Sequence, residues 1–477
     1  QVQPWRDAEG VEKLDAWIEF WGKYLPQIFG VAKALADSVF INPEGLMDFK
    51  GFAAEVLYFK ELQEKTGVKL EVIRHGKYKS AVEPFLSDRM SDNNREQITT
   101  LLTSLWQVVL SDIADSRNIS TSSLNTIADT LGARTPEMAI ATGLLDGTHY
   151  DDEYDTQWRS VLGLSETEEV PTVTLKDYLS GGNGKSSSFG SDKIAVIYAQ
   201  GEILYGEGDR EIIGQQTMQR AFEKVRDDDR IKAVVLRVNS PGGSSLVSDM
   251  IWREVILTKA KKPVVASFGN TAASGGYYLA AGADKIIAQS TTVTGSIGVF
   301  GTIPNIHEFA KDIGVNAEQV GTNKNSIDYS LFEPMTDTFR QQLTESIEQT
   351  YQTFLQRVAD GRNMTLAEVD SIAQGRVWSG TEALSLGLID ELGDLNTAVT
   401  MAAEMAGIED YSIRNYPKYP SEIERLLEDF DGTKLEIGEA ALKTEIGDEA
   451  FETLKALQRI TQQKGVQARL PFNLNIQ

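Results

Sequence analysis

The sequence predicts an α/β protein built from repeated strand–helix units, and three observations carry this prediction. Short runs of β-branched residues alternate with stretches whose apolar residues have helical spacing, a pattern typical of parallel sheets covered by helices. Glycine- and serine-rich turns follow the ends of several predicted strands, where α/β proteins usually bind their ligands. Two parts of the chain also resemble each other at a nearly constant offset.

Length and composition limit the possible functions. The chain has 477 residues, too many for one ordinary core, so we expect two or three domains. Its net charge of −24 is spread along the sequence, which argues against a nucleic-acid partner. Because the sequence has no cysteine, disulfides, zinc–thiolate sites and a cysteine nucleophile are excluded. Without a long apolar run or a signal-peptide pattern, this chain is expected neither to span a membrane nor to carry its own export signal.

Changes in composition divide the chain into five segments. They are a helical N-terminal segment (1–36), a first α/β repeat (37–173), a glycine- and serine-rich linker (174–191), a second α/β repeat (192–410) and an acidic, helical C-terminal extension (411–477). Apolar spacing predicts that the N-terminal helix runs from about 11 to 35. We interpret the extension as packed or solvated rather than as part of a site.

In the first repeat, the pattern predicts a strand at 38–41 that leads into a turn at 42–45. Helical spacing predicts helices at 52–65 and 93–115, with a strand at 69–73 between them. Because strands and helices alternate, we expect parallel α/β layers in this part of the chain too.

In the second repeat, strands are predicted at 193–199 and 233–238, with a helix at 215–225 between them. A Pro-Gly-Gly sequence at 241–243 predicts a tight turn after the second strand. Another helix then leads to a buried strand that begins at Val264.

The two repeats match in short stretches but differ at their starts. The matching stretches are 36–39 with 283–286, 67–71 with 314–318, and 143–146 with 387–390. The first copy has only 36 residues before Asp37, with no Pro-Gly-Gly sequence and with Gln27 where the second copy has Ser274. We therefore interpret the first copy as truncated at its start.

Ser274 is a candidate nucleophile because it lies between a predicted strand and a helix, among small residues. Backbone N–H groups at a helix start are unpaired and favour developing negative charge. Small neighbours such as Gly275 would let a substrate chain lie close to the backbone. On this stretch alone, a helix start packed against a sheet is the more ordinary explanation.

A serine hydroxyl needs a base to act as a nucleophile at neutral pH. The three histidines, His75, His149 and His307, have no triad-like context, and we interpret them as surface or packing residues. Lysine is the remaining choice if burial lowers its pKa. Lys79 is the candidate because it follows a strand and a glycine and has apolar or small neighbours, although a solvated surface cation is the usual role of a lysine.

Two glycine-containing stretches are candidates for binding a substrate carbonyl and a peptide backbone. Gly242 and Gly243 could form an oxyanion hole, or only a tight turn. Thr294, Gly295 and Ser296 could form an exposed strand edge that pairs with an extended peptide, or only a strand entry. The sequence has no metal-binding or phosphate-loop motif, so no cofactor is expected.

Five motifs, in this order, resemble the signal peptide peptidase A (protease IV) family in its long, two-repeat bacterial form. They are Gly-Lys-Tyr-Lys-Ser-Ala-Val-Glu-Pro-Phe (76–85), Leu-Arg-Val-Asn-Ser-Pro-Gly-Gly-Ser (236–244), Ala-Ala-Ser-Gly-Gly-Tyr (272–277), Thr-Gly-Ser-Ile-Gly (294–298) and Gly-Arg-Val-Trp-Ser-Gly (375–380). The similarity runs from about residue 37 to about residue 407.

The resemblance implies a crotonase-like α/β fold, shared with the proteolytic subunit of caseinolytic protease, and a serine–lysine dyad. By this match Ser274 would be the nucleophile, Lys79 the general base, and Gly242 or Gly243 an oxyanion donor. Lys324 is a rival base because short, single-repeat members carry both dyad residues in one repeat. Its polar, asparagine-rich surroundings would keep its pKa high, so we prefer Lys79.

The resemblance further implies a homotetrameric ring at the periplasmic face of the bacterial inner membrane that degrades cleaved signal peptides and other apolar peptides. Residues 1–36 do not match the family, whose membrane anchor and first half of repeat one have no counterpart here. A crotonase-type acyl-CoA enzyme and an inactive, membrane-associated ring scaffold are the alternatives. With the base in one repeat and the serine in the other, we expect activity to depend on domain assembly.

Overall fold

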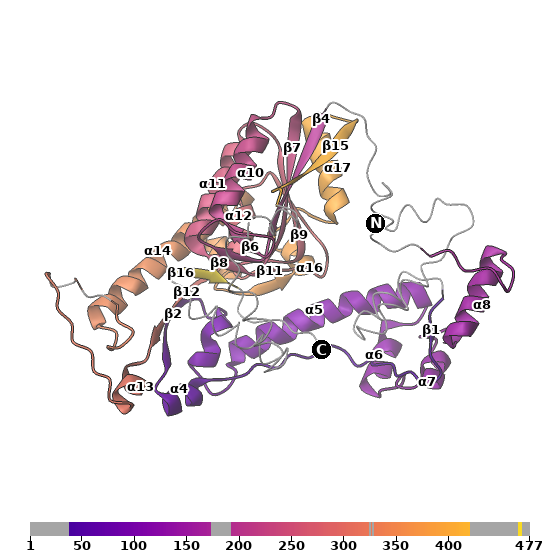
Figure 1. Cartoon of the computed structure of the whole chain (residues 1–477), viewed down its shortest axis with the longest axis horizontal. Coiled ribbons are helices and arrows are strands. Elements are labelled where there is room, and N and C mark those ends of the chain that lie inside the picture. Colours follow the sequence, from indigo (N-terminus) through magenta and orange to yellow (C-terminus); the bar gives the residue numbers. More distant parts are fainter. Residues whose placement is uncertain (1–37, 173–191, 324–325, 327–328, 420–465, 470–477) are drawn as a thin grey trace. The chain divides into compact units, whose positions relative to one another are not determined.

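Figure 1 presents a computed structural model of the chain, which describes residues 38–172, 192–323, 326, 329–419 and 466–469. The predicted helix at 11–35, the predicted linker and Lys324 lie outside these residues. The chain folds into two compact units. Unit 1 comprises Gln1–Ala54, Leu102–Ser187 and Leu474–Gln477, and unit 2 comprises Glu55–Leu101 and Ser188–Asn473.

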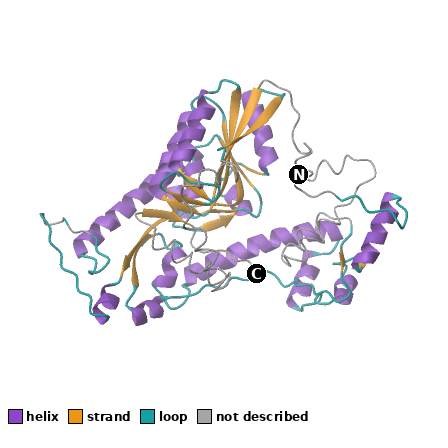
Figure 2. Ribbon diagram, in the orientation of Figure 1, coloured by secondary structure: helices purple, strands orange, loops and turns teal. Residues whose placement is uncertain are grey.

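An eight-stranded sheet forms the centre of unit 2 (Figure 2). Its strands are β4 (Asp192–Gln200), β7 (Ile231–Ser240), β9 (Val264–Ala273), β10 (Lys285–Ala288), β11 (Val293–Gly295), β13 (Val377–Ser379), β14 (Glu391–Leu392) and β15 (Tyr411–Tyr416). The main path runs β13-β11-β9-β7-β4-β15, and β10 joins β9 to β14. All neighbours are parallel except β11 and β13. The chain is thus an α/β protein, as the sequence predicts.

Helices cover both faces of this sheet because alternate side chains of its strands point to opposite sides. Ala195 and Ile197 pack in a core with α10 (Gln215–Asp227) and α11 (Ser245–Lys259). Ile194 and Val196 pack instead with α17 (Leu395–Ala406). Figure 1 shows α10 and α11 on one side of the sheet and α17 on the other.

The remaining helices of unit 2 connect or flank these layers. They are α4 (Lys60–Thr66), the 3₁₀ helix η2 (Ser80–Phe85), α12 (Gly275–Ala280), α13 (His307–Asp312), α14 (Asp337–Arg362), α15 (Leu366–Ile372) and α16 (Gly380–Ser385). No helix in the described ranges is long and apolar enough to cross a bilayer.

A second sheet of six strands also belongs to unit 2. In spatial order its strands are β2 (Lys69–His75), β12 (Val299–Asn305), β16 (Val466–Arg469), β8 (Gly242–Ser244), β5 (Glu202–Leu204) and β6 (Ile212–Gly214). The pairs β2–β12, β12–β16 and β16–β8 are antiparallel, whereas β8–β5 and β5–β6 are parallel.

The second repeat matches its predicted elements closely, with strands β4, β7 and β9 and helix α10 at the expected positions. The predicted tight turn is wrong in part, because the two glycines after Pro241 begin strand β8. The C-terminal extension is also not helical throughout, since β15 and β16 are strands of the two sheets.

The first repeat departs further from the prediction. The helix predicted at 52–65 is shorter, and α4 begins only at Lys60, because the Phe59 N–H donates to the Pro84 carbonyl (2.7 Å) and its ring stacks on Phe85. Parallel layers are not formed around β2, which pairs antiparallel along seven residues with β12 from the second repeat. The long helix is confirmed as α5 (Asp92–Arg117).

Unit 1 is mainly helical in its described part. It contains the parallel strands β1 (Phe40–Ile41) and β3 (Gly147–Thr148), helices α6 (Thr121–Asp129), α7 (Pro136–Ala141) and α8 (Asp151–Leu162), and the C-terminal part of α5. Its core includes Val39, Leu110, Leu124 and Leu144. The predicted turn after β1 is confirmed by a hydrogen bond from the Gly45 N–H to the Asn42 carbonyl (2.8 Å).

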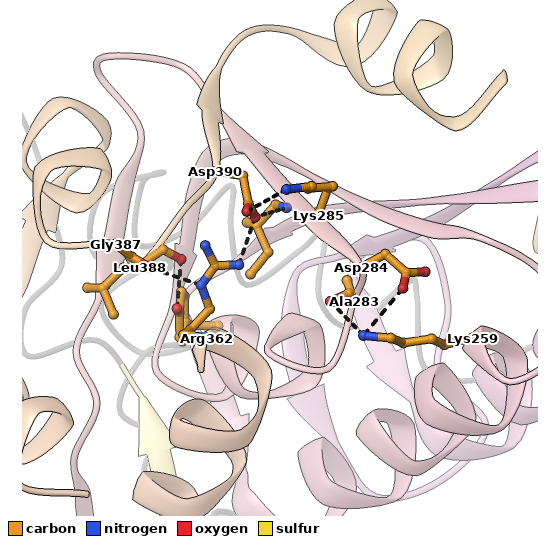
Figure 3. A network of polar contacts seen from close by, with 10 residues as sticks. Lys259, Ala283, Asp284, Lys285, Arg362, Gly387, Leu388 and Asp390 are labelled. Atoms are coloured by element: carbon orange, nitrogen blue, oxygen red, sulfur yellow. Dashed lines mark hydrogen bonds and ion pairs between the residues drawn. The ribbon is translucent and has the colours of Figure 1, made fainter. Parts of the chain in front are cut away.

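The internal repeat is visible as two equivalent sets of hydrogen bonds. In the first copy, Asp146 accepts from the Val39 N–H (2.6 Å) and from Arg117 at the end of α5 (2.7 Å). In the second, Asp390 accepts from the Ile286 N–H (2.8 Å) and from Arg362 at the end of α14 (2.7 Å; Figure 3). Both helices have 26 residues, and β10–β14 is a parallel pair like β1–β3.

The compact units cut through the first predicted repeat. Residues 55–101, which include Lys79, pack in the same unit as Ser274. Repeats describe similarity along the sequence, whereas units describe which residues pack together. The two candidate dyad residues therefore do not lie on opposite sides of a boundary between compact units.

Candidate active site

Ser274 directly follows β9 and is the N-cap residue of α12. Its backbone has φ 54° and ψ −116°, in the positive-φ region that non-glycine residues rarely adopt. The Ser274 N–H donates to the Gly295 carbonyl (2.8 Å), and its own carbonyl accepts from the Tyr278 N–H (2.8 Å). Strain of this kind costs about 1–3 kcal/mol and persists where surrounding structure enforces it, often at functional sites.

The glycines that follow Ser274 are required by close contacts. A Cβ atom on Gly275 would lie 2.6 Å from the Ser248 hydroxyl, and one on Gly276 would lie 2.7 Å from the Ser240 carbonyl oxygen. The small residues of this stretch thus allow α12 to approach the ends of β7 and α11. Gly275 and Gly276 therefore serve both the packing of α12 and the candidate site around Ser274.

Tyr277 anchors α12 to the loop before β14. Its hydroxyl donates to the Leu388 carbonyl (2.7 Å), next to the contacts of Arg362 with the Gly387 carbonyl (2.9 Å) and with Asp390. Figure 3 shows this network, in which Lys285 also reaches Asp390 (3.3 Å). The Tyr277 hydroxyl therefore ties α12, the helix that begins directly after Ser274, to the loop before β14.

Lys79 lies in the turn between β2 and η2, and its amine reaches Ser274. Lys79 Nζ lies 2.7 Å from Ser274 Oγ, 3.0 Å from Ser296 Oγ and 3.1 Å from the Ser296 carbonyl oxygen. All three side chains have 0% exposure. The structure thus brings together two candidate residues that are 195 positions apart in the sequence.

Burial lowers the pKa of Lys79 well below its usual value of 10.5. The three neighbouring oxygens belong to two serines, and none is a carboxylate that would favour the ammonium form. A neutral amine at hydrogen-bonding distance from a hydroxyl can accept its proton.

Glycines make room for Lys79 on two sides. A Cβ atom on Gly375, which has φ +81°, would lie 2.6 Å from Lys79 Cβ, and one on Gly298 would lie 3.3 Å from Lys79 Cδ. The Tyr78 N–H donates to the Gln374 carbonyl (2.9 Å), which fixes the turn against the same segment. Sequence reasoning included both glycines in motifs but assigned them no role.

Ser296 is placed differently from the prediction. The expected exposed edge at Thr294, Gly295 and Ser296 is wrong, because β11 pairs with β9 on one side and with β13 on the other. Thr294 and Ser296 are fully buried, and the Thr294 hydroxyl donates to the Ala272 carbonyl (2.7 Å). Ser296 instead contacts Lys79, a role that only the fold reveals.

Gly242 and Gly243 lie beside the residue that follows Ser274. Their φ values are +100° and +152°, and a Cβ atom on Gly275 would lie 3.2 Å from the Gly243 nitrogen. The Gly242 N–H donates to Ser240 Oγ (3.2 Å). Backbone groups of β8 and of the start of α12 thus meet next to Ser274.

The histidines take part in other contacts. His75, His149 and His307 each lie within 4 Å of a glutamate, and the nearest pair joins His75 Nδ1 to Glu348 (2.6 Å). Within the described ranges, no group of three His, Asp or Glu residues is placed to hold a metal ion.

Comparisons with known proteins identify relatives over most of the chain. The model of "Peptidase family S49" matches residues 31–162 and residues 256–409. "Protease 4" of Salmonella typhi is 36% identical over 84% of this chain and 65% of its own length. "Serine protease SPPA, chloroplastic" of Arabidopsis thaliana is 32% identical over 78% of this chain and 56% of its own length.

A solved structure of a membrane-bound stomatin-specific protease with a substrate peptide matches 50% of this chain and 97% of that chain, with 15% identity and a TM-score of 0.32.

The chain spans just under two thirds of the length of the Salmonella relative and a little over half of the length of the plant relative. The family model covers more than half of the chain in two separate matches, in agreement with the internal repeat. The chain belongs to peptidase family S49.

Proposed function

We propose that this chain is a serine peptidase in which Ser274 is the nucleophile and Lys79 the general base. The observation that carries the proposal is the 2.7 Å contact between Lys79 Nζ and Ser274 Oγ in a fully buried site. Membership of a peptidase family supports it independently. A crotonase-type acyl-CoA enzyme would have no use for this pair, and the family match does not support an inactive scaffold.

The contacts of Lys79 suggest how its proton is handled. A neutral amine has two N–H groups and one lone pair. If the N–H groups donate to the carbonyl and hydroxyl oxygens of Ser296, the lone pair faces the Ser274 hydroxyl. Ser296 is then a positioning residue, which orients the base without touching the substrate.

The reaction begins when Ser274 Oγ attacks the carbonyl carbon of a peptide bond and its proton passes to Lys79 Nζ. The C–N bond breaks, and the leaving nitrogen takes the proton from Lys79. Water then attacks the acyl-enzyme and gives a proton to Lys79. The acyl group leaves as a carboxylic acid, and Ser274 Oγ recovers its proton.

The oxyanion formed in both steps needs backbone donors. We assign this role to the N–H groups of Gly243 and Gly275, which lie close to each other beside Ser274. Gly242 is the weaker candidate of the two predicted glycines, because its N–H already donates to Ser240 Oγ.

For the substrate and location we propose cleaved signal peptides and other apolar peptides, hydrolysed by a homotetramer at the periplasmic face of the bacterial inner membrane. The order of the five motifs supports this proposal, because their resemblance is to the long bacterial form of the signal peptide peptidases.

A fluorophosphonate probe that reacts with activated serines tests the dyad. We expect Ser274→Ala to abolish labelling and Lys79→Met to slow it by at least about 100-fold, since the serine loses its base. Lys77→Met is the matched control, because Lys77 is an exposed lysine two residues away and its replacement should leave labelling unchanged.

Labelling that persists in Ser274→Ala would overturn the nucleophile assignment. Lys324→Ala tests the rival base. If that variant lost labelling while Lys79→Met kept it, Lys79 would not be the base.

A further inference from the structure

Arg376 lies directly before β13, and three neighbouring side chains hold its guanidinium group. Its Cζ atom lies 4.8 Å from the centre of the Tyr78 ring and 4.4 Å from the centre of the Trp378 ring. Two of its nitrogens donate to the two carboxylate oxygens of Glu96, at 3.0 and 2.7 Å. A planar guanidinium can make these ring contacts and both hydrogen bonds at once, whereas the ammonium group of a lysine cannot.

The backbone of Arg376 contacts the residue that faces Lys79 from the other side. The Ser296 N–H donates to the Arg376 carbonyl (2.6 Å), and the Gly375 N–H donates to the Ile297 carbonyl (2.8 Å). Ser296 in turn lies against the amine of Lys79 through both of its oxygens. Arg376 therefore contacts Ser296 through its backbone and, through its side chain, the residue that precedes Lys79.

The ion pair with Glu96 connects Arg376 to the helix that holds the lysine turn. Gln97, the next residue of α5, is 1% exposed, and its amide donates to the Tyr78 carbonyl (3.0 Å) and to Ser80 Oγ (3.0 Å). These two acceptors lie on either side of Lys79 in the sequence. Consecutive residues of α5 thus hold the two segments that enclose the candidate base.

We propose that Arg376 is a positioning residue of the dyad, which holds the loop at 374–376 against the turn at 78–80 and so fixes Lys79 Nζ next to Ser274 Oγ. This inference rests on the proposed function, because it takes Lys79 as the base for Ser274. Arg376 acts through Tyr78 and Ser296, and the two nitrogens that make its ion pair are directed to Glu96.

The base needs such support because no ion pair holds its amine. The three oxygens near Lys79 Nζ belong to Ser274 and Ser296, and none is a carboxylate. A lysine side chain has many rotamers, so the two backbone segments around it must select one. A misplacement of about 1 Å in a catalytic site can slow a reaction by about 100-fold.

A second arginine in unit 2 has a similar environment away from the base and provides a matched control. The Cζ atom of Arg357 lies 3.7 Å from the centre of the Trp252 ring, and its Nε donates to Asp249 (3.2 Å). Arg357→Gln removes the charge and the ring contact there, as Arg376→Gln does beside Tyr78. It leaves the turn at 78–80 and the loop at 374–376 unaltered.

The experiment measures fluorophosphonate labelling of Ser274 at increasing probe concentrations in the unaltered chain and in Arg376→Gln, Arg376→Lys and Arg357→Gln. We expect Arg376→Gln to lower the maximal rate constant by about 10- to 100-fold, with Arg376→Lys between it and the unaltered chain. The probe concentration that gives half of the maximal rate should not change, because the base does not hold the probe. Arg357→Gln should label like the unaltered chain.

This readout separates positioning from stability. A purely structural role would lower the unfolding midpoint or the fraction of molecules that label, but not the rate constant of the folded ones. A rate constant in Arg376→Gln equal to that in Arg357→Gln would therefore overturn the inference and leave the proposed function standing. If Ser274 of the unaltered chain is not labelled, the proposed function itself fails.

Glu96→Lys keeps the test decisive if circular dichroism shows that Arg376→Gln does not fold. The Glu96 side chain is 49% exposed, so the replacement is tolerated at the surface, and its positive charge repels the guanidinium of Arg376. We expect the maximal rate constant to fall by about 10-fold in this variant. An unchanged rate constant in folded Glu96→Lys would overturn the inference.

Discussion

At the scale of single residues, the environment of Lys79 depends on the absence of a side chain at Gly375. The positive φ of Gly375 and its close approach to Lys79 leave no room for a side chain. Gly387 has a similar φ of +74° but nothing within 4 Å of its Cβ position. A comparison of the two glycines therefore separates the effect of a left-handed backbone, which both have, from the effect of contact with Lys79, which only Gly375 has.

Replacement of these glycines by alanine should have different effects. Gly387→Ala should lower the free energy of unfolding by about 1 kcal/mol, the cost of a left-handed non-glycine residue, and leave probe labelling unchanged. Gly375→Ala should cost a further 1–3 kcal/mol, roughly, and slow labelling by more than about 10-fold, because Lys79 must move. Urea denaturation and labelling rates measure both. Equal labelling by the two variants would contradict this view of Lys79.

The lowered pKa of Lys79 predicts how stability depends on pH. Between the lowered pKa and 10.5, the unfolded chain binds a proton at this lysine that the folded chain does not. The free energy of unfolding should therefore rise with pH across this window, by up to about 1.4 kcal/mol per pH unit. Above 10.5 both states are neutral there and the effect ends.

Lys79→Met removes this contribution and serves as the reference. The unfolding free energy of the unaltered protein minus that of Lys79→Met should rise with pH above the lowered pKa and level off above 10.5. Urea denaturation at several pH values measures it. A difference that stays constant would show that Lys79 is protonated in the folded protein. Labelling of Ser274 should likewise rise with pH through the lowered pKa and then level off.

At the scale of elements, the two repeats keep the same anchor while their surroundings differ. In each copy an aspartate joins the start of a strand to an arginine at the end of a 26-residue helix. Burial alone would raise the pKa of Asp390, but the hydrogen bond and charge of Arg362, with the Ile286 N–H and Lys285, lower it. In the second copy this anchor also holds Tyr277 on α12.

Asp390→Asn should lower the stability of unit 2 by about 2–3 kcal/mol, because Arg362, whose side chain is 8% exposed, loses a charged hydrogen-bond partner. Asp410→Asn is the control, since it removes the same charge from an exposed position. Thermal unfolding measures both. Asp390 stabilises the fold above its ordinary pKa of 3.8, and this is lost as pH falls through the lowered value. The deficit of Asp390→Asn should therefore shrink in acid, and a deficit independent of pH would contradict the charge argument.

At the scale of the whole molecule, the boundary between the two repeats along the sequence does not coincide with the boundary between the two compact units. Residues 55–101 come from the first repeat, yet they supply β2 and Lys79 to unit 2. Seven residue pairs join β2 to β12. Covalent continuity between the repeats should therefore not be needed to keep Lys79 next to Ser274.

A specific protease site inserted into 174–191 tests this expectation. After cutting, the two pieces should elute together in size-exclusion chromatography, and Ser274 should still be labelled at a rate similar to that of the uncut chain. The physical reason is that strand pairing and burial, rather than the linker, hold residues 55–101 in place. Separation of the pieces with loss of labelling would contradict it.

Local sequence patterns were sufficient for much of the second repeat. Strands β4, β7 and β9 and helix α10 follow from runs of β-branched residues and from helical spacing, because each pattern records which side of an element is buried. The position of Ser274 at the end of a strand follows in the same way. Two of the three pairs of matching stretches, 36–39 with 283–286 and 143–146 with 387–390, likewise appear in the structure as matching hydrogen bonds.

Local patterns do not say which strands become neighbours, and only the tertiary structure decided this. Periodicity could not show that β11 has a partner on both sides, that β2 pairs with β12, or that Ala468 lies beside Gly243. By itself the sequence determined the type of fold, its repeats and Ser274 and Lys79 as candidates. Their contact, the part of Ser296 in it and the place of β16 between β8 and β12 arise from pairing between residues far apart in the chain, which the free energy of the whole fold selects.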